Sequence, residues 1–212
     1  MAQITATTFV SLDGVMQAPG GPSEDTSDGF RLGGWSVPYG DETFGDYMAK
    51  VFEHAGGFLL GRRTYDIFAS YWPRVTDPDN PIATGLNSLP KYVASATLTA
   101  PEWHDTTVLE GDAVAAARKL KEQPGDEIQI HGSGALIRSL LGHDVIDLHR
   151  LLVFPVYLGT GARLFPDGAA ALGFEVVDRT AVGAGGGITA LTLRPTGPAR
   201  TGSYELPPEN AR

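Results

Sequence analysis

Segments patterned like strands alternate with segments patterned like helices along most of this chain. Strand-like runs cover 4–10, 57–60, 91–95, 106–109, 127–131 and 148–157, and helix-like runs begin near 41, 64, 112 and 133. Such alternation is typical of a mostly parallel sheet covered by helices, because two parallel strands need a crossover connection. Two further β-patterned runs, 174–182 and 188–194, flank the glycine-rich segment 183–187 and predict a closing antiparallel hairpin. We therefore expect an α/β protein with about eight strands.

The length of 212 residues suits one domain with a sizeable core, which we place at 1–195, before a tail over 196–212 that is rich in Pro and Gly. A net charge of -9 opposes binding to nucleic acid or to an anionic membrane, so the expected partner is a small molecule. The absence of cysteine excludes disulfides, thiolate metal sites and a cysteine nucleophile. The first residues lack a signal-peptide pattern and no stretch is long enough to span a membrane, so we expect a cytoplasmic protein.

The segment 14–40 is crowded with Gly, Pro, Ser and Asp and predicts a long loop ahead of the first helix. Loops of this length inside a compact domain are uncommon and tend to be lids or binding loops. We interpret this one as a lid.

Three of the predicted parallel strands end in glycine or small hydroxyl residues, in the sequences GRRTY (61–65), SAT (95–97) and HGSGAL (131–136). In an open parallel sheet, ligands bind beyond the carboxyl ends of the strands, where backbone N–H groups can face an anion. Gly132 and Gly134 would let the backbone approach a diphosphate, beside a helix that Ser133 caps and that runs to Leu141. A tight turn without a ligand is the alternative for the glycines taken alone.

Charged and hydroxyl donors cluster at the other two turns. Arg62, Arg63 and Thr64 follow Gly61, and the SAT turn adds Ser95 and Thr97. Arginine gives charge-assisted hydrogen bonds to phosphate, so the combination favours a phosphate monoester such as a 2'-phosphate. The alternative is a solvated arginine pair beside an N-cap threonine.

Other binding motifs are absent from the sequence, which has no GxGxxG between a strand and a helix, no Walker sequence, no HExxH and no spacing for a metal site. His131 ends the strand before the glycine turn, where its side chain could act in a cleft or be packed in the core. Trp35, Tyr39 and Trp72 are candidates for the flat walls of a heteroaromatic substrate site, with core or lid packing as the alternative.

Six short sequences in this order resemble the dihydrofolate reductase superfamily, in the branch of the riboflavin-biosynthesis reductase (RibD C-terminal) domain. They are SLDG (11–14), LLGRRTY (59–65), YWP (71–73), VASATL (93–98), IQIHGSGALIRSLL (128–141) and FPVYLGTGARLF (154–165). The resemblance covers about residues 4–194. It implies a three-layer α/β/α fold with a mostly parallel eight-stranded sheet and an antiparallel C-terminal strand. It also implies an NADPH-dependent reductase that transfers hydride, usually to a C=N bond, and a homodimer.

The same resemblance implies roles for the residues at the turns. Those at the GRRTY and SAT turns would hold the adenosine-phosphate half of NADPH: Gly61, Arg62, Arg63, Thr64, Ser95 and Thr97. Those at the third turn would hold the diphosphate: Gly132, Ser133, Gly134 and Ala135. Asp13, Gly14 and Val15 would lie at the nicotinamide end, where SLDG begins the covering loop.

The sequence departs from dihydrofolate reductases at the acidic residue of the first helix, where alignment to GRRTY places Gly45. Asp46, Asp41 or Glu42 could substitute if the helix is shifted, with a solvated carboxylate or one at the helix N-terminus as the alternative for each. Asp46 and His131 are the candidate catalytic acids. The riboflavin-type reductase uses cationic residues for a ribose-phosphate pyrimidine, for which Arg31 and Arg163 are the candidates.

Three functions remain open on this sequence. The first is an NADPH-dependent reductase of a pterin-like, pyrimidine-like or related small molecule. The second is a non-catalytic NADP-binding or sensor protein with the same groove. The third is a structural or interaction module on a reductase-like fold, since a fold alone does not establish activity.

Overall fold

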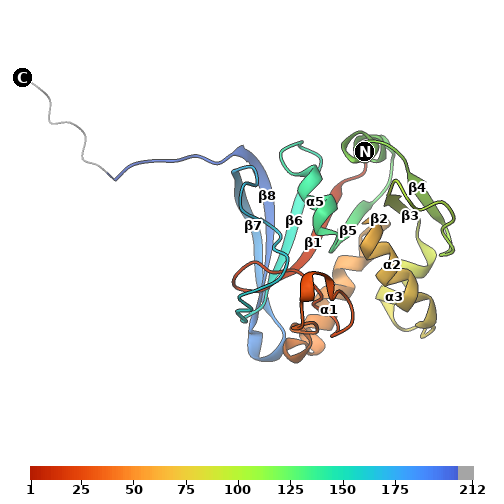
Figure 1. The fold of residues 1–212 in the computed structure, drawn as a ribbon, viewed down its shortest axis with the longest axis horizontal. Coiled ribbons are helices and arrows are strands. Elements are labelled where there is room, and N and C mark those ends of the chain that lie inside the picture. The colour runs from red at the N-terminus through yellow and green to blue at the C-terminus, as the bar shows by residue number, and fades with distance from the viewer. Residues whose placement is uncertain (205–212) are drawn as a thin grey trace, which may run out of the picture.

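The computed structural model describes residues 1–204, which form one eight-stranded sheet in the order β4-β3-β2-β5-β1-β6-β8-β7 (Figure 1). The strands are β1 Ile4–Val10, β2 Ala55–Gly61, β3 Lys91–Ala94, β4 Thr106–Leu109, β5 Glu127–His131, β6 Leu148–Val153, β7 Leu172–Val182 and β8 Ile188–Pro198. Neighbours from β4 to β6 pair in parallel, and β8 pairs antiparallel with both β6 and β7. The predicted mostly parallel sheet with its antiparallel C-terminal strand is confirmed.

Five α-helices cover the two faces of the sheet. They are α1 Glu42–Glu53, α2 Arg62–Tyr71, α3 Pro81–Ser88, α4 Ala113–Glu122 and α5 Gly134–Leu140. Buried side chains of α1, α2 and α3 join one apolar cluster, and those of α4 and α5 join another on the opposite face. Alternate residues of β2 divide between the two clusters, with Phe58 and Leu60 in the first and Leu59 in the second, as the two-residue period of a strand requires. The three-layer arrangement is therefore confirmed. None of the helices in the described residues has the length and apolarity needed to cross a membrane.

Helix α3 lies between α2 and β3, where the sequence showed no helix-like run. The side chain of Asn80 accepts a hydrogen bond of 3.0 Å from the Ala83 N–H and so caps the helix, and Pro81 occupies its first position, where a missing N–H costs nothing. Ala83 and Leu86 are buried beneath it. Eight residues with a proline at the start give too short a periodic pattern to be recognised.

The C-terminal hairpin is longer than predicted. Strand β7 begins at Leu172, and β8 continues past the expected domain boundary at 195 to Pro198, which pairs with Leu172. The Pro and Gly of this segment are tolerated because the residues of β8 beyond Leu193 pair with β7 and have no partner on β6. Strand β6, in contrast, ends at Val153 instead of 157, ahead of Pro155. Residues 205–212 of the predicted tail lie outside the described residues.

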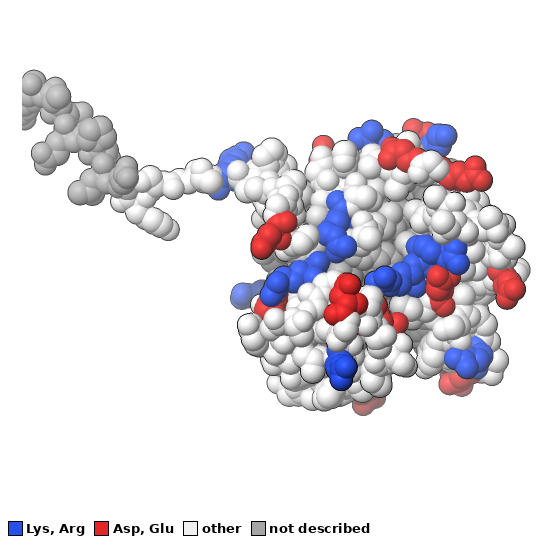
Figure 2. Space-filling view, viewed as in Figure 1, with Lys and Arg blue, Asp and Glu red and all other residues white. Residues whose placement is uncertain are grey.

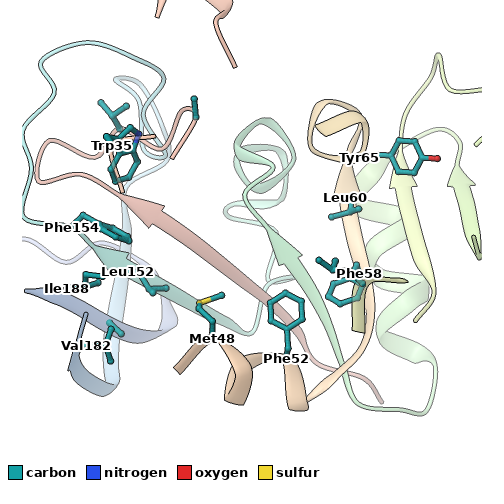
Figure 3. Packing of buried hydrophobic residues seen from close by; sticks show 14 of the residues in the cluster. Trp35, Met48, Phe52, Phe58, Leu60, Tyr65, Leu152, Phe154, Val182 and Ile188 are labelled. Carbon is teal, nitrogen blue, oxygen red and sulfur yellow. The ribbon is translucent and has the colours of Figure 1, made fainter. Parts of the chain in front are cut away.

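The segment between β1 and α1 contains no strand and only two short 3-10 helices, Ser27–Gly29 and Val37–Tyr39. It is nevertheless packed against the body of the protein. Trp35 is buried at one end of the cluster drawn in Figure 3, edge-on to Phe154 with ring centroids 5.4 Å apart. Its indole N–H donates a hydrogen bond of 2.7 Å to the Gln17 carbonyl. The predicted loop therefore exists and is anchored in the core.

Candidate functional site

The three turns singled out in the sequence lie side by side. Strands β3, β2 and β5 are neighbours in the sheet and run parallel, so their carboxyl ends share one edge. Arg62 and Arg63 begin α2 at this edge, and Arg138 of α5 donates a hydrogen bond of 3.1 Å to the carbonyl of Arg163 nearby. Figure 2, in the same view as Figure 1, shows basic side chains across the centre of the molecule, although the chain has a net charge of -9.

The turns after β2 and β5 are hydrogen-bonded to each other. The Gly61 N–H donates to Ser133 Oγ at 3.0 Å, and the Ser133 N–H donates to Thr64 Oγ1 at 3.1 Å. Gly132 and Ser133 both adopt left-handed backbone, with φ of 58° and 54°. Ser133 does not cap α5 as the sequence predicted, because a left-handed residue cannot aim its side chain as an extended N-cap does. It joins two of the turns instead.

The turn after β3 meets α2 through Arg62. The guanidinium donates from Nε to both carboxylate oxygens of Asp66 at 2.9 Å and from Nη1 to Thr97 Oγ1 at 3.4 Å. Ser95 Oγ accepts from the Thr97 and Leu98 N–H groups at 3.2 and 3.1 Å, which fixes the shape of the SAT turn. The structure thus brings Arg62, Ser95 and Thr97 together.

Arg63 points to the long loop. Its Nη1 donates to Asp25 Oδ2 and to Ser27 Oγ, each at 3.0 Å. Burial raises the pKa of Asp25, but hydrogen bonds from Ser27 and the charge of Arg63 outweigh this effect and hold the pKa below its usual value. The Asp25 carboxylate is therefore ionised at neutral pH.

The SLDG sequence is held against the segment 154–165. Asp13 accepts hydrogen bonds from Ser11 Oγ at 2.7 Å and from the Leu158 and Gly159 N–H groups at 3.1 and 2.9 Å. Burial alone would raise the pKa of Asp13, but these hydrogen bonds lower it by more, so the pKa lies below its usual value. Gly14 has a φ of 79°, and Val15 forms an antiparallel bridge with Arg163, whose Nε also donates to the Asp13 carbonyl. Asp13, Gly14 and Val15 are thereby fixed at the carboxyl end of β1.

His131 is buried between α1 and the sheet. Its ring stacks on Phe52 with centroids 4.6 Å apart, and its Nε2 lies 2.9 Å from Gln129 Oε1. Burial, with the charge of Arg150, lowers the pKa of His131 to about 3. The imidazole is therefore neutral at pH 7, which favours a packing role over that of the acid suggested by the sequence.

Asp46 lies on the exposed side of α1, which turns Met48, Val51 and Phe52 toward the sheet. The side chain is fully on the surface and takes no part in the contacts of the three turns. The position of Gly45 is open as well, since an added Cβ would meet nothing within 4 Å.

The three candidate aromatic residues separate in the structure. Trp35 belongs to the core, and the Tyr39 hydroxyl donates to the Pro155 carbonyl at 3.4 Å beside Phe154. Trp72 follows α2, where it packs edge-on against Phe68 and Tyr71. Trp35 therefore supports the loop from below, and only Tyr39 and Trp72 are partly exposed.

Three residues near the turns were not recognised in the sequence. Met16 packs so closely on Gly134 that an added Cβ there would overlap its sulfur. Arg138 Nη1 lies 3.0 Å from the same Cβ position, and Asp25 pairs with Arg63. No sequence signal marks Met16 or Asp25, because only the path of the loop brings them to the turns. Arg138 could have been found from its place one helical turn after Gly134.

One cavity lies at the opposite edge of the sheet. It has a volume of about 510 Å³ and is lined by parts of 73–78 and 83–88 together with 102–104. The segments 83–88 and 102–104 precede β3 and β4, so the cavity borders the amino ends of these strands. Ligands of open parallel sheets bind at the carboxyl ends, which sets this cavity apart from the three turns.

Comparison with known proteins identifies a matching family and proteins of similar sequence or fold. The family model described as RibD C-terminal domain matches residues 2–185. The uncharacterized protein YyaP of Bacillus subtilis (strain 168) is 28% identical over 160 residues, which are 74% of this chain and 77% of that protein. A putative riboflavin biosynthesis protein from Shewanella sp. PV-4 superposes with a TM-score of 0.67 at 24% identity, over 92% of this chain and 99% of that one. Dihydrofolate reductase from Enterococcus faecalis, in complex with NADP(H), gives a TM-score of 0.56 at 13% identity, over 92% and 96% of the two chains.

Proposed function

The chain belongs to the RibD C-terminal domain family, and on that premise we propose that it is an NADPH-dependent reductase of a small pterin-like or pyrimidine-like substrate. The observation that carries the proposal is the meeting of three donor-rich turns at the carboxyl ends of adjacent strands β3, β2 and β5. Such an edge is where open α/β sheets hold nucleotides. The complex of the Enterococcus faecalis enzyme with NADP(H) supports a nicotinamide cofactor on this fold.

Arg62, Ser95 and Thr97 would hold the 2'-phosphate of the cofactor. The guanidinium already reaches Thr97, and its only carboxylate partner among the described residues, Asp66, is itself half exposed. A phosphate placed between Arg62 and the two hydroxyls would gain charge-assisted hydrogen bonds that NADH cannot make. This set predicts preference for NADPH.

The turn Gly132–Ala135 would hold the diphosphate. Gly61, Arg63 and Thr64, which the resemblance assigns to the adenosine-phosphate half, would take part in holding the diphosphate instead. The hydrogen bonds between Gly61, Ser133 and Thr64 fix the two turns relative to each other before any ligand binds. Gly134 has no room for a side chain, and Arg138 adds a cation beside it. A rigid site that includes a cation suits the negatively charged diphosphate.

The nicotinamide end would lie near Asp13, Gly14 and Val15, and NADPH when bound would supply the hydride. These residues fasten the start of the loop to segment 154–165 at the carboxyl end of β1. Tyr39 and Trp72 are partly exposed and remain candidates for contact with the substrate. Arg31 and Arg163 are exposed and remain candidates for its charged group.

A non-catalytic NADP-binding protein is the alternative, and one observation favours it. Neither candidate acid is suited to give up a proton at the turns, because His131 is neutral and buried and Asp46 is on the surface. If the protein is a reductase and neither residue donates the proton, water that reaches the substrate nitrogen would have to supply it. Such a protein would bind NADPH without oxidising it.

The test is a titration of purified protein with NADPH and, separately, NADH, by tryptophan fluorescence and calorimetry. We expect one site per chain and tighter binding of NADPH than of NADH. A panel of pterins and pyrimidines is then added while NADPH oxidation is followed by absorbance. Oxidation with any member establishes a reductase, binding without oxidation supports the alternative, and binding of neither dinucleotide refutes both.

The family resemblance also implies a homodimer, which we include in the proposal. Light scattering on the purified protein tests it directly, since a dimer has twice the mass of the 22.4 kDa chain. A mass that stays at one chain at all concentrations would remove this part of the proposal.

A further inference from the structure

The long loop reaches α2 through a single charged contact. Arg63 Nη1 donates to the Asp25 carboxylate at 3.0 Å, and the same carboxylate accepts from the N–H and Oγ of Ser27 at 3.0 and 2.6 Å. The Asp25 side chain is only 15% exposed, whereas that of Arg63 is 67% exposed. Asp25 is thus built into the loop, and Arg63 is the partner that is free to leave.

The loop also covers the glycine turn. Met16 lies directly on Gly134, nine residues before Asp25. Gln17 joins the two contacts, because its Nε2 donates to the Asp25 and Ser27 carbonyls at 3.3 and 3.1 Å while its Oε1 accepts from the Ala162 N–H at 2.9 Å. Residues 16–27 therefore form one connected strap from the glycine turn to α2.

Arg63 cannot serve this strap and a cofactor phosphate equally well. The guanidinium donates to the strap from Nη1, and because its fork of donors is planar and fixed, turning the other nitrogens toward a phosphate would move Nη1 as well. A phosphate carries more negative charge than one carboxylate and offers several acceptor oxygens, so it competes well for the same donors. A ligand at the glycine turn would at the same time need the space that Met16 occupies.

We propose that Asp25 is a resident counter-ion for Arg63, that a phosphate of the dinucleotide takes its place, and that this exchange releases the part of the strap around Asp25 and Ser27 from α2. This inference rests on the proposed function and adds to it a residue that sets cofactor affinity. Asp25 weakens binding, because the ion pair must break before Arg63 can turn to the phosphate. The same break couples occupancy of the groove to the position of the strap.

Asp25→Asn removes the charge but keeps the shape and an oxygen that can accept from Ser27. Partly exposed ion pairs are weak, so we expect the affinity for NADPH to rise about threefold. Asp28→Asn is the matched control, since it removes an equal charge from the same loop at an exposed residue with a φ of 55°, which Asn tolerates well. It should leave the affinity unchanged.

Trypsin cleavage after the exposed Arg31 reports on the strap. We expect NADPH to speed this cleavage in the unaltered protein, and Asp25→Asn to be cleaved several times faster even without NADPH. Arg63→Gln should also be cleaved faster, but it should bind NADPH more weakly. A pair that only stabilised the fold would change affinity in the same direction in both variants, whereas the exchange changes it in opposite directions.

The outcomes separate the two proposals. If the unaltered protein binds neither dinucleotide, the proposed function fails and the exchange fails with it. If it binds NADPH but Asp25→Asn gains neither affinity nor faster cleavage relative to Asp28→Asn, only the exchange is overturned. Opposite changes of affinity in Asp25→Asn and Arg63→Gln, with faster cleavage in both, support the exchange.

Discussion

The three turns at one end of the proposed groove and the region of α1 at the other are built from different kinds of contact. At the β2, β3 and β5 turns, backbone N–H groups and short hydroxyl side chains bond to one another over a few residues, as in the Gly61–Ser133–Thr64 chain. At the α1 end, aromatic rings from distant segments pack together. The ring centroid of Phe9 lies 5.5 Å from that of Phe44 and 5.4 Å from that of Phe154. The first kind of site is specified locally, and the second depends on how the whole chain folds.

Polar residues beneath α1 extend this contrast. Arg150 donates from two nitrogens to Glu127 at 2.7 and 2.9 Å, and Gln129 donates to Glu127 and, at 2.6 Å, to the Val51 carbonyl. His131 completes the chain through Gln129. The sheet is therefore hydrogen-bonded to the last turn of α1 at one end, whereas the end that carries the three turns relies on the turns alone.

The largest expected effect comes from breaking the ion pair beneath α1. Arg150→Met should lower the free energy of unfolding in urea by about 3–5 kcal/mol, because it leaves Glu127 buried without a cation. The two side chains are only 11% and 13% exposed. Arg194→Met breaks the pair with Glu175, whose members are 54% and 59% exposed, and should cost no more than about 1 kcal/mol. Equal losses would show that the α1 end does not depend on its buried charges.

His131 makes the same end sensitive to acid. Its pKa is lowered to about 3 in the folded protein by burial, so only the unfolded chain binds the proton between that value and about 6.5. Stability is therefore complete above pH 6.5 and falls as the pH is lowered, by about 2 kcal/mol at pH 5. His149, whose pKa burial lowers to about 4, acts in the same direction.

His131→Gln tests this assignment. Between pH 7 and pH 5 its free energy of unfolding should fall by about 2 kcal/mol less than that of the unaltered protein. His143→Gln, at an exposed residue, is the control and should follow the unaltered protein. If the two variants show the same pH dependence, His131 is not held neutral by the fold.

The contrast between the two ends also explains what the sequence could predict. The mostly parallel class of the sheet and the place of the three turns at one edge follow from strand patterns and from glycines next to strand ends, which are local signals. The places of Trp35 in the core, Met16 on Gly134 and Asp25 on Arg63 depend on the path of a loop without periodicity. The hydrogen bond from Gly61 to Ser133 replaced a predicted helix cap, because a left-handed turn cannot be inferred for a serine.

At the proposed cofactor end, Arg62→Gln is the variant that separates phosphate recognition from dinucleotide binding. Loss of a charge-assisted hydrogen bond costs about 1.5 kcal/mol, so the affinity for NADPH should fall about tenfold in calorimetry. The affinity for NADH should change little, since it has no 2'-phosphate. Arg194→Gln, far along the sheet on β8, is the control. An equal fall in the affinity for both dinucleotides would indicate that Arg62 binds the diphosphate and not the 2'-phosphate.

The smallest expected effect compares two glycines at the starts of helices. Gly45→Ala should stabilise the protein by about 0.5–1 kcal/mol, because the added Cβ meets nothing within 4 Å and α1 gains helix propensity. Gly134→Ala should destabilise it, because the Cβ would overlap Met16. Urea unfolding measures both. Opposite signs would show that glycine is required by packing at the cofactor end and not in α1, so that an acidic residue at position 45 would be compatible with the fold. Two losses would show instead that α1 also needs its glycine.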